Sequence, residues 1–321
     1  MTEPRSDTPR VTLGTSDLAV SPLSLGGNVF GWTADEARSF AVLDAYAAAG
    51  GNFVDTADVY SAWVPGNTGG ESETVIGDWL RSRGNRDEIV IATKVGSHPD
   101  LSGLRAKTIK RGAEESLRRL GIERIDLFYT HRDDLDTPVE EIVTALDELV
   151  REGKVRALGA SNIGPDRLAE SLEFAAREGL AGYVAVQPHY NLVARAAYEG
   201  EPAAVVARYG LAAVPYSALA SGFLTGKYRP GGGPVDSARA VGAGRYLEDP
   251  RGPRVLAAVD QVAEAHRVEP ATVALAWLAS QPTVAAPIAS ARTVEQLAPL
   301  VAAAGLVLTE QELKLLDEAS A

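Results

Sequence analysis

Six apolar segments along the chain each end in side chains that could bind a ligand or move a proton. In chain order these end residues are Asp55, Lys94, His131, Ser161–Asn162, Gln187 and Tyr216–Ser217. A polar residue after one strand is ordinary, but six such ends in succession favour one shared pocket. The pocket would form if the segments were neighbouring parallel strands, because the carboxyl ends of barrel strands meet on one face.

Asp55, Lys94 and His131, with Tyr60 five residues after Asp55, have the chemistry of a proton transfer. An ammonium group beside a phenol favours the phenolate, so Lys94 is predicted to lower the pKa of Tyr60 from about 10 towards neutrality. Tyr60 would then serve as a general acid, while Asp55 keeps Lys94 charged and in place. His131 would orient a substrate carbonyl through a hydrogen bond.

The apolar segments that carry these residues recur at intervals of about 30 residues, the length of a strand followed by a helix. With the short runs Pro22–Gly26 and Val284–Ile288, the number of candidate strands reaches eight. Nearly continuous apolar strands that alternate with helical periodicity predict a parallel sheet covered by helices. Eight such units fit a closed (β/α)8 TIM barrel better than an open, doubly wound sheet, although spacing alone does not decide between them.

Helix starts are indicated by a Thr followed three residues later by a Glu, the capping-box pattern. The three matches are Thr33-x-x-Glu36, Thr137-Pro138-x-Glu140 and Thr309-x-x-Glu312. The strand period breaks between Leu211 and Val284, where Arg229–Pro253 is rich in Gly and Pro. We expect a long loop there, extra helices near Val255–His266 and Pro270–Ser280, and a C-terminal helix after the eighth strand.

The composition argues against several classes of function. Lys and Arg number 31 against 43 Asp and Glu, a net charge of −12 that opposes non-specific binding to nucleic acid or an anionic membrane. The absence of cysteine excludes disulfides and thiolate nucleophiles, and four histidines without metal-ligand spacing predict no metal site. The polar start MTEPRSDTPR lacks a signal-peptide pattern, and no apolar run reaches the ~18 residues that span a bilayer. We therefore expect a single domain over residues 1–321, located in the cytoplasm, with a small-molecule partner.

Six segments together carry a resemblance to a known family. They are FVDTADVY (53–60), IATKVG (91–96), FYTHRDD (128–134), LGASN (158–162), VQPHYN (186–191) and VPYSALASGFLTGKY (214–228). In this order they closely resemble the aldo-keto reductase superfamily over about residues 10–319, in its bacterial branch, with some likeness to potassium-channel β-subunit-like members. The resemblance implies a (β/α)8 barrel that binds NADPH and reduces aldehydes or ketones to alcohols. It also implies that the catalytic residues are Asp55, Tyr60, Lys94 and His131, the set already assembled from the strand ends.

The resemblance also assigns residues to the nicotinamide end of NADP(H). Ser161, Asn162 and Gln187 match positions that hydrogen-bond the nicotinamide carboxamide, and Tyr216 matches the aromatic residue that stacks on its ring. Asn28 is a further expected cofactor contact. The segment that contains it, residues 26–31, only superficially matches G-x-G-x-x-G, because its third position is Asn28 and no acidic partner follows, so no Rossmann turn is expected.

The phosphates and adenosine fall, by the same resemblance, on the C-terminal half of the chain. The backbone of Ser217 and Leu219, with Lys227 nearby, matches the pyrophosphate site. Ser290 and Arg292 match positions that bind the adenosine 2′-phosphate, at the start of a helix whose dipole favours anions, and this Arg favours NADPH over NADH.

The adenosine end combines one match with two departures. Gln296 matches an adenosine-side position. Relatives commonly carry Glu-Asn where this chain has Pro299 and Leu300, so their polar contacts with adenine are not expected here.

Candidate substrate-pocket residues come from two loops. Trp63 is predicted to line the pocket, because the segment 61–70 replaces a short Tyr-Gly link of relatives. Phe30 and Trp32 of the first loop are further candidates. The expected substrate is a small-molecule carbonyl compound.

A second interpretation belongs to a different class of protein. Tyr216 followed by Ser-x-Leu-Ala, and the Gly-Lys-Tyr segment at 226–228, are similar to the potassium-channel β subunits. The chain could then be a nucleotide-binding regulatory or redox-sensing subunit with little turnover. The enzyme is favoured because no additional protein-docking segment is visible in the sequence.

Overall fold

The protein is built around a parallel sheet of eight strands. The computed structural model describes residues 9–233 and 235–321; the polar start, residues 1–8, and Pro234 within the predicted long loop lie outside the described residues. Along the chain the eight strands are β3 (Ser24–Gly26), β4 (Phe53–Asp55), β5 (Val90–Val95), β8 (Ile125–Thr130), β9 (Val155–Ser161), β10 (Tyr183–Gln187), β11 (Ala212–Ala213) and β12 (Ile288–Ala289). Their order in the sheet is β11-β10-β9-β8-β5-β4-β3-β12, and every paired neighbour is parallel.

Backbone hydrogen bonds join the two edges of this sheet. The Ala213 amide in β11 donates to the Thr283 carbonyl (2.8 Å), and the Ala285 amide donates back to the Ala213 carbonyl (2.9 Å). The Ile288 amide at the start of β12 donates to the Pro215 carbonyl (2.8 Å). These bonds close the sheet, so the predicted (β/α)8 barrel is confirmed and the open sheet is excluded.

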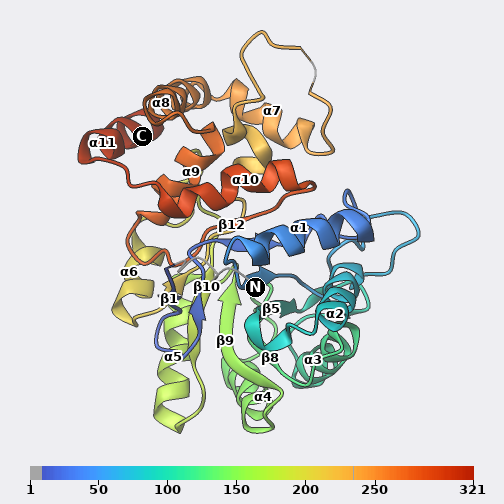
Figure 1. Cartoon of the computed structure of the whole chain (residues 1–321). Helices are drawn as coiled ribbons and strands as arrows, with labels where there is room; N and C mark the ends of the chain where they lie inside the picture. The colour runs from blue at the N-terminus through green and yellow to red at the C-terminus, as the bar shows by residue number, and fades with distance from the viewer. Residues whose placement is uncertain (1–8, 234) are drawn as a thin grey trace.

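Helices cover the outside of the barrel (Figure 1). The six that connect successive strands are α1 (Glu36–Ala48), α2 (Glu71–Arg83), α3 (Ala106–Leu120), α4 (Val139–Arg151), α5 (Pro165–Glu178) and α6 (Glu201–Arg208). A short 3-10 helix, η1 (Arg86–Glu88), precedes β5, and the hairpin β6 (Ser97–His98) and β7 (Leu101–Ser102) follows it. Among residues 9–233 and 235–321, no helix is both long and apolar enough to cross a membrane.

The connection between β11 and β12 departs from the regular strand-helix pattern. It contains η2 (Ala220–Thr225), α7 (Ala240–Glu248), α8 (Arg251–His266) and α9 (Pro270–Ala279). After β12 the chain continues through α10 (Val294–Ala302), η3 (Ala303–Gly305) and α11 (Glu310–Ser320). The prediction of one loop over Arg229–Pro253 is therefore wrong in part, because that range holds all of α7 and the start of α8. Packing of the Tyr246 ring on Phe223 (5.3 Å between centroids) stabilises α7 in spite of its two glycines.

Two of the three expected capping boxes are absent. Helix α1 begins after Asp35, whose carboxylate accepts from the Arg38 amide (2.9 Å), so Thr33 is not its cap. The Thr137 hydroxyl donates to Asp134 (2.7 Å), and Pro138 precedes α4 without a side-chain cap. A nearer acceptor or a stronger cap has displaced the expected Thr in each case. Thr309 does form the capping box of α11.

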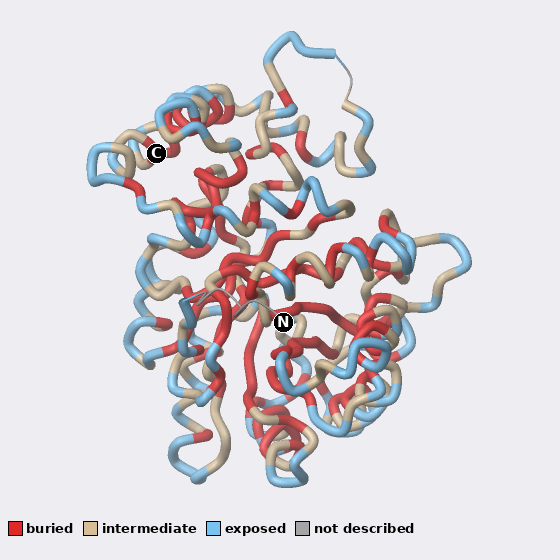
Figure 2. Tube along the Cα trace, in the orientation of Figure 1, coloured by how far each residue is buried: buried red, intermediate tan, exposed pale blue. Residues whose placement is uncertain are grey.

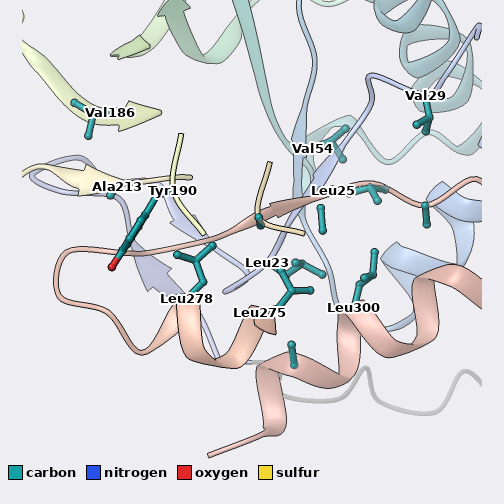
Figure 3. Packing of buried hydrophobic residues seen from close by; sticks show 14 of the residues in the cluster. Leu23, Leu25, Val29, Val54, Val186, Tyr190, Ala213, Leu275, Leu278 and Leu300 are labelled. Atoms are coloured by element: carbon teal, nitrogen blue, oxygen red, sulfur yellow. The ribbon is translucent and has the colours of Figure 1, made fainter. Parts of the chain in front are cut away.

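Buried residues run through the strands and along the helices (Figure 2); among the described residues they form two large hydrophobic clusters and a small third one between α4 and α5. One large cluster fills the barrel, and its N-terminal end is closed by the hairpin β1 (Val11–Thr12) and β2 (Ala19–Val20), which contributes Leu13 and Leu18. The other large cluster lies between strands and helices. Figure 3 shows part of it, where Leu275 of α9 lies near Leu23, and Leu300 of α10 near Leu25.

Candidate active site

The carboxyl ends of β4, β5 and β8 bring four predicted residues together. Asp55 is the last residue of β4, Lys94 lies in β5, and His131 directly follows β8. Tyr60 lies in the turn after β4. The Tyr60 and His131 rings have centroids 6.1 Å apart in an edge-to-face arrangement. Parallel pairing of these strands therefore brings residues that are far apart in sequence into one cluster.

Lys94 is the centre of this cluster. Its side chain is fully buried, and Nζ donates to Asp55 Oδ2 (2.7 Å), to the Thr56 carbonyl (2.7 Å) and to the Tyr60 hydroxyl (2.8 Å). An ammonium group has three donors, so all of them are used. The three bonds fix the position of Nζ relative to the Tyr60 oxygen.

Burial decides the protonation of Tyr60. Burial, with the nearby charge of Asp55, raises the pKa of Tyr60 well above its ordinary value. The expectation that the pKa of Tyr60 is lowered towards neutrality is wrong, because the loss of solvation around the phenol and the Asp55 charge raise it. Burial also lowers the pKa of Lys94, although Asp55 opposes that change. The phenol therefore keeps its proton at neutral pH and is available as a donor.

His131 is a neutral imidazole at neutral pH. Burial, with the charges of Lys94 and Arg132, lowers its pKa to about 3. Its Nδ1 atom is buried and has no hydrogen-bond partner among the described residues. A neutral ring next to Tyr60 can donate a hydrogen bond to an acceptor in the site without carrying a charge.

A second row of polar residues surrounds Asp55. Gln187 Nε2 donates to Asp55 Oδ1 (2.8 Å), and the Ser161 hydroxyl donates to the Gln187 carbonyl (2.9 Å). The Tyr216 hydroxyl donates to Asn162 Oδ1 (2.8 Å). These bonds link the ends of β4, β9, β10 and the segment after β11.

A cavity of about 1070 Å³ lies over these strand ends. The predicted site residues that line it are Asn28, Trp32, Asp55, Tyr60, His131, Ser161, Asn162, Gln187, Tyr216, Ser217, Leu219, Lys227, Ser290, Arg292 and Gln296. Lys94 is not part of the lining and reaches the cavity only through Tyr60 and Asp55. The structure thus gathers almost all of the predicted residues around one cavity.

The three substrate-pocket candidates occupy different environments. Phe30 is fully buried in the hydrophobic core and does not line the cavity, because its apolar ring packs inward, so it is corrected from pocket residue to core residue. Trp63 does not line the cavity either, because it is 48% exposed on the surface; its ring lies edge-on to Trp32 (5.5 Å) and to Tyr60 (6.2 Å). Trp32 and Trp63 therefore form an aromatic pair beside Tyr60.

The far end of the cavity lies between β12 and α10. Ser290 Oγ donates to Asn28 Oδ1 (2.8 Å), which ties β12 to the first loop. The Gln296 side chain accepts from the Arg292 amide (3.0 Å). Pro299 and Leu300 also border the cavity, and the Pro299 carbonyl accepts from Thr272 (2.8 Å). The two departures noted in the sequence thus contribute apolar surface to this end.

Comparison with known proteins identifies the family. The family model described as "Aldo/keto reductase family" matches residues 22–321. This chain belongs to the aldo/keto reductase family. It is 37% identical over 295 residues to a probable voltage-gated potassium channel subunit beta of Oryza sativa subsp. japonica, covering 89% of this chain and 88% of that protein.

Two other relatives have names that refer to redox enzymes. The chain is 35% identical over 329 residues to the uncharacterized oxidoreductase YrpG of Bacillus subtilis, covering 95% of this chain and 94% of that protein. It is 30% identical over 327 residues to norsolorinic acid reductase of Aspergillus flavus, covering 97% of this chain and 80% of that protein.

Three of the basic residues that line the cavity of this aldo/keto reductase family member, Lys227, Arg239 and Arg292, form a cluster. Burial, with smaller effects of Arg292 and Arg239, lowers the pKa of Lys227, and burial, with a smaller effect of Arg292, lowers that of Arg239. Three like charges in one cavity repel one another, and an anionic ligand would relieve that repulsion. The cluster, in a cavity of this size, fits the phosphates of a dinucleotide.

Arg239 is the residue of this cluster that sequence reasoning missed. It directly precedes α7, lines the cavity, and its guanidinium lies 5.7 Å from the Trp32 ring centroid. In the sequence, Arg239 is one basic residue in the segment Arg229–Pro253. The spacing of the strands does not indicate that this segment lies over the cavity. The His189 ring stacks on the Tyr216 ring, with 5.3 Å between the centroids, and so helps to hold that tyrosine in place.

The absence of a metal site stays a prediction. Within residues 9–233 and 235–321, no group of three or more His, Cys, Asp or Glu side chains could hold a metal ion. His98 accepts from the Asp100 amide (3.2 Å), and His266 pairs with Glu312 (2.7 Å).

Proposed function

We propose that the protein is an NADPH-dependent oxidoreductase that reduces aldehydes or ketones to alcohols. One observation carries the proposal: the phenol of Tyr60 lines the cavity, and its oxygen is held 2.8 Å from the buried Nζ of Lys94. This arrangement supplies a proton and stabilises the phenolate that remains.

Each catalytic residue has a distinct task in this proposal. When bound, reduced nicotinamide supplies a hydride to the carbonyl carbon. Tyr60 gives its proton to the carbonyl oxygen, so the alcohol forms and the phenolate left behind is stabilised by Lys94. Asp55 holds Lys94, and the neutral His131 hydrogen-bonds the carbonyl oxygen. Solvent then returns a proton to Tyr60, which completes the cycle.

The cofactor residues of the proposal follow the length of the cavity. The nicotinamide would be held by Ser161, Asn162 and Gln187 and would stack on Tyr216. The residues proposed for the phosphates and adenosine are Asn28, Ser217, Leu219, Lys227, Arg239, Ser290, Arg292 and Gln296. Three cations at that end support a cofactor with an additional phosphate, NADPH, over NADH. Trp32 and Trp63 would form an aromatic wall on the substrate side.

Replacement of the phenol tests this function. Tyr60→Phe should reduce kcat for 4-nitrobenzaldehyde and methylglyoxal by about 10²–10⁴, the usual contribution of a general acid. NADPH affinity, measured by fluorescence titration, should change little. Tyr209→Phe is the matched control, because Tyr209 bonds Glu173 on the exposed surface. Full activity of Tyr60→Phe would refute Tyr60 as the acid.

A regulatory or redox-sensing subunit is the second candidate. The similarity to the rice protein named as a probable channel subunit supports it. Such a subunit would bind NADPH tightly and reduce at most one equivalent of carbonyl, with negligible steady-state turnover. Comparison of single-turnover and steady-state rates for NADPH oxidation separates the two functions.

A further inference from the structure

Asp58 lies in the sequence between Asp55 and Tyr60 but does not face the cavity. Its side chain is 1% exposed, and it is not among the residues that line the cavity. Its backbone amide donates to the Lys94 carbonyl (3.2 Å), so it is attached directly to the strand position of the central lysine. Neither carboxyl oxygen has a hydrogen-bond partner of good geometry among the described residues.

The charged groups around Asp58 come from three elements. Both cations among them already donate hydrogen bonds to other acceptors. On β5, Lys94 donates its three hydrogens to other acceptors. On α3, Arg119 Nε donates to Glu73 Oε2 of α2 (2.6 Å). The other oxygen of Glu73 accepts from the Thr93 hydroxyl (2.6 Å). Asp58 therefore sits beside one anion and two cations but receives a side-chain hydrogen bond from none of them.

The loop before α2 adds one more titratable neighbour. A Cβ placed on Gly69 would lie 2.6 Å from His98 Nε2 and 3.0 Å from the Asp58 carbonyl oxygen. Gly69 therefore lies close to both the His98 ring and the Asp58 backbone. Its Nδ1 accepts from the Asp100 amide (3.2 Å).

An ionised carboxylate in this environment would be costly, because burial without a side-chain donor removes solvation that nothing replaces in full. Burial, reinforced by the charge of Glu73, raises the pKa of Asp58 to about 8. Arg119, the Val59 amide and Lys94 oppose this increase but do not cancel it. At neutral pH the side chain is therefore mainly a neutral carboxylic acid.

We propose that Asp58 is a positioning residue for Lys94 and that it acts as a neutral carboxylic acid. In this form the residue, bonded through its amide to the Lys94 carbonyl, adds no second negative charge near the ammonium group. Lys94 then remains on Asp55 and Tyr60. This role rests on the proposed function, because it acts through the lysine that stabilises the Tyr60 phenolate.

Ionisation of Asp58 would weaken proton donation. A second anion near Lys94 makes formation of the Tyr60 phenolate less favourable, and the acid efficiency of a donor falls as its pKa rises. The reduction rate should therefore decrease as the pH passes the Asp58 midpoint. This decrease requires no change in substrate binding, so it should appear in kcat.

The pH profile of kcat tests the role. For the wild-type protein, kcat for NADPH oxidation with 4-nitrobenzaldehyde should fall about tenfold or more between about pH 6.5 and 9.5, with a midpoint near the Asp58 pKa of about 8. Asp58→Asn keeps the shape of the neutral acid but cannot ionise, so this midpoint should disappear. Asp166→Asn, an exposed aspartate at the start of α5, is the matched control and should keep the wild-type profile. An Asp58→Asn profile with the wild-type midpoint would overturn the proposal.

A second measurement needs no variant and no activity. In wild-type protein labelled with ¹³C at the aspartate side-chain carboxyls, one resonance should titrate with a midpoint near pH 8. If every aspartate resonance has its midpoint below about pH 6, Asp58 is not held neutral at neutral pH and the proposal is wrong. If the wild-type protein reduced no carbonyl compound, the proposed function would fail, while this titration would still decide the state of Asp58.

Discussion

Replacement of Lys94 by Met should destabilise the protein through the charge that it leaves behind. Lys94 is fully buried and donates to Asp55 Oδ2 at 2.7 Å, while Asp55 is itself 2% exposed at the side chain. Methionine fills a similar volume but donates no hydrogen bond. Asp55 would keep the bond from Gln187 Nε2 (2.8 Å) and a longer one from the Tyr60 hydroxyl (3.4 Å), neither of which carries a positive charge. A buried carboxylate that loses its cation typically costs about 3–5 kcal/mol of unfolding free energy.

A second substitution separates the charge effect from the loss of packing. Asp55→Asn removes the negative charge with little change in shape, so Lys94→Met/Asp55→Asn should recover much of the lost stability. The double variant should be more stable than the sum of the two single effects predicts, with a coupling energy of about 1–3 kcal/mol. All four proteins are compared by urea unfolding at neutral pH, followed by circular dichroism and tryptophan fluorescence.

Additive losses of unfolding free energy in the two single variants would refute this reasoning. If the double variant lost the sum of the two single losses, the pair would contribute through packing alone. Lys110→Met is the matched control, because Lys110 pairs with Glu148 on the exposed surfaces of α3 and α4. Water already solvates both of these groups, so the control should leave the urea midpoint nearly unchanged.

Two further predictions concern His131 and Arg292. The folded-state pKa of His131, about 3, lies below the unfolded value of 6.5, so its contribution to stability is complete above about pH 6.5 and is lost as the pH falls towards 3. The wild-type protein should therefore lose about 2 kcal/mol of unfolding free energy between about pH 6.5 and 5, and His131→Gln should not show this loss. Urea unfolding at the two pH values measures it. An equal loss in the variant and the wild type would contradict the lowered pKa of His131. Arg292→Ala should raise the Kd for NADPH about tenfold or more in fluorescence titrations, and the Kd for NADH much less. Arg177→Ala, on exposed α5, should alter neither Kd, and equal effects of Arg292→Ala on both cofactors would exclude Arg292 as a 2′-phosphate ligand.

The fold and most of the candidate site could be predicted because both depend on strand ends. Strand period alone could not separate an open sheet from a barrel, since that choice depends on the bonds between Ala213 and residues 283–285. Once neighbouring parallel strands are assumed, Asp55, Lys94 and His131 must share one face. Their proximity therefore follows from chain order.

Features that depend on contacts between distant segments could not be predicted. The sequence places Phe30 in a loop near the site, which favoured a role in the substrate pocket. In the structure it is fully buried, because the turn at residues 27–34 directs its ring into the core. Arg239 reads as one basic residue in a long segment, yet formation of α7 places it over Trp32. The pKa of Tyr60 depends on its burial, which no spacing rule describes, and its predicted direction was wrong.

Asp55 and Asp58 show why residue type alone does not define chemical role. They are three positions apart, and both side chains are almost fully buried. Asp55 receives hydrogen bonds from Lys94 and Gln187, which compensate the charge of a carboxylate. Asp58 receives no side-chain hydrogen bond of this kind, because the same lysine is already saturated and Arg119 is held by Glu73. One aspartate can therefore work as an anion and the other as a neutral acid, and that difference is decided by donors from β5, β10 and α3 rather than by the segment that carries both.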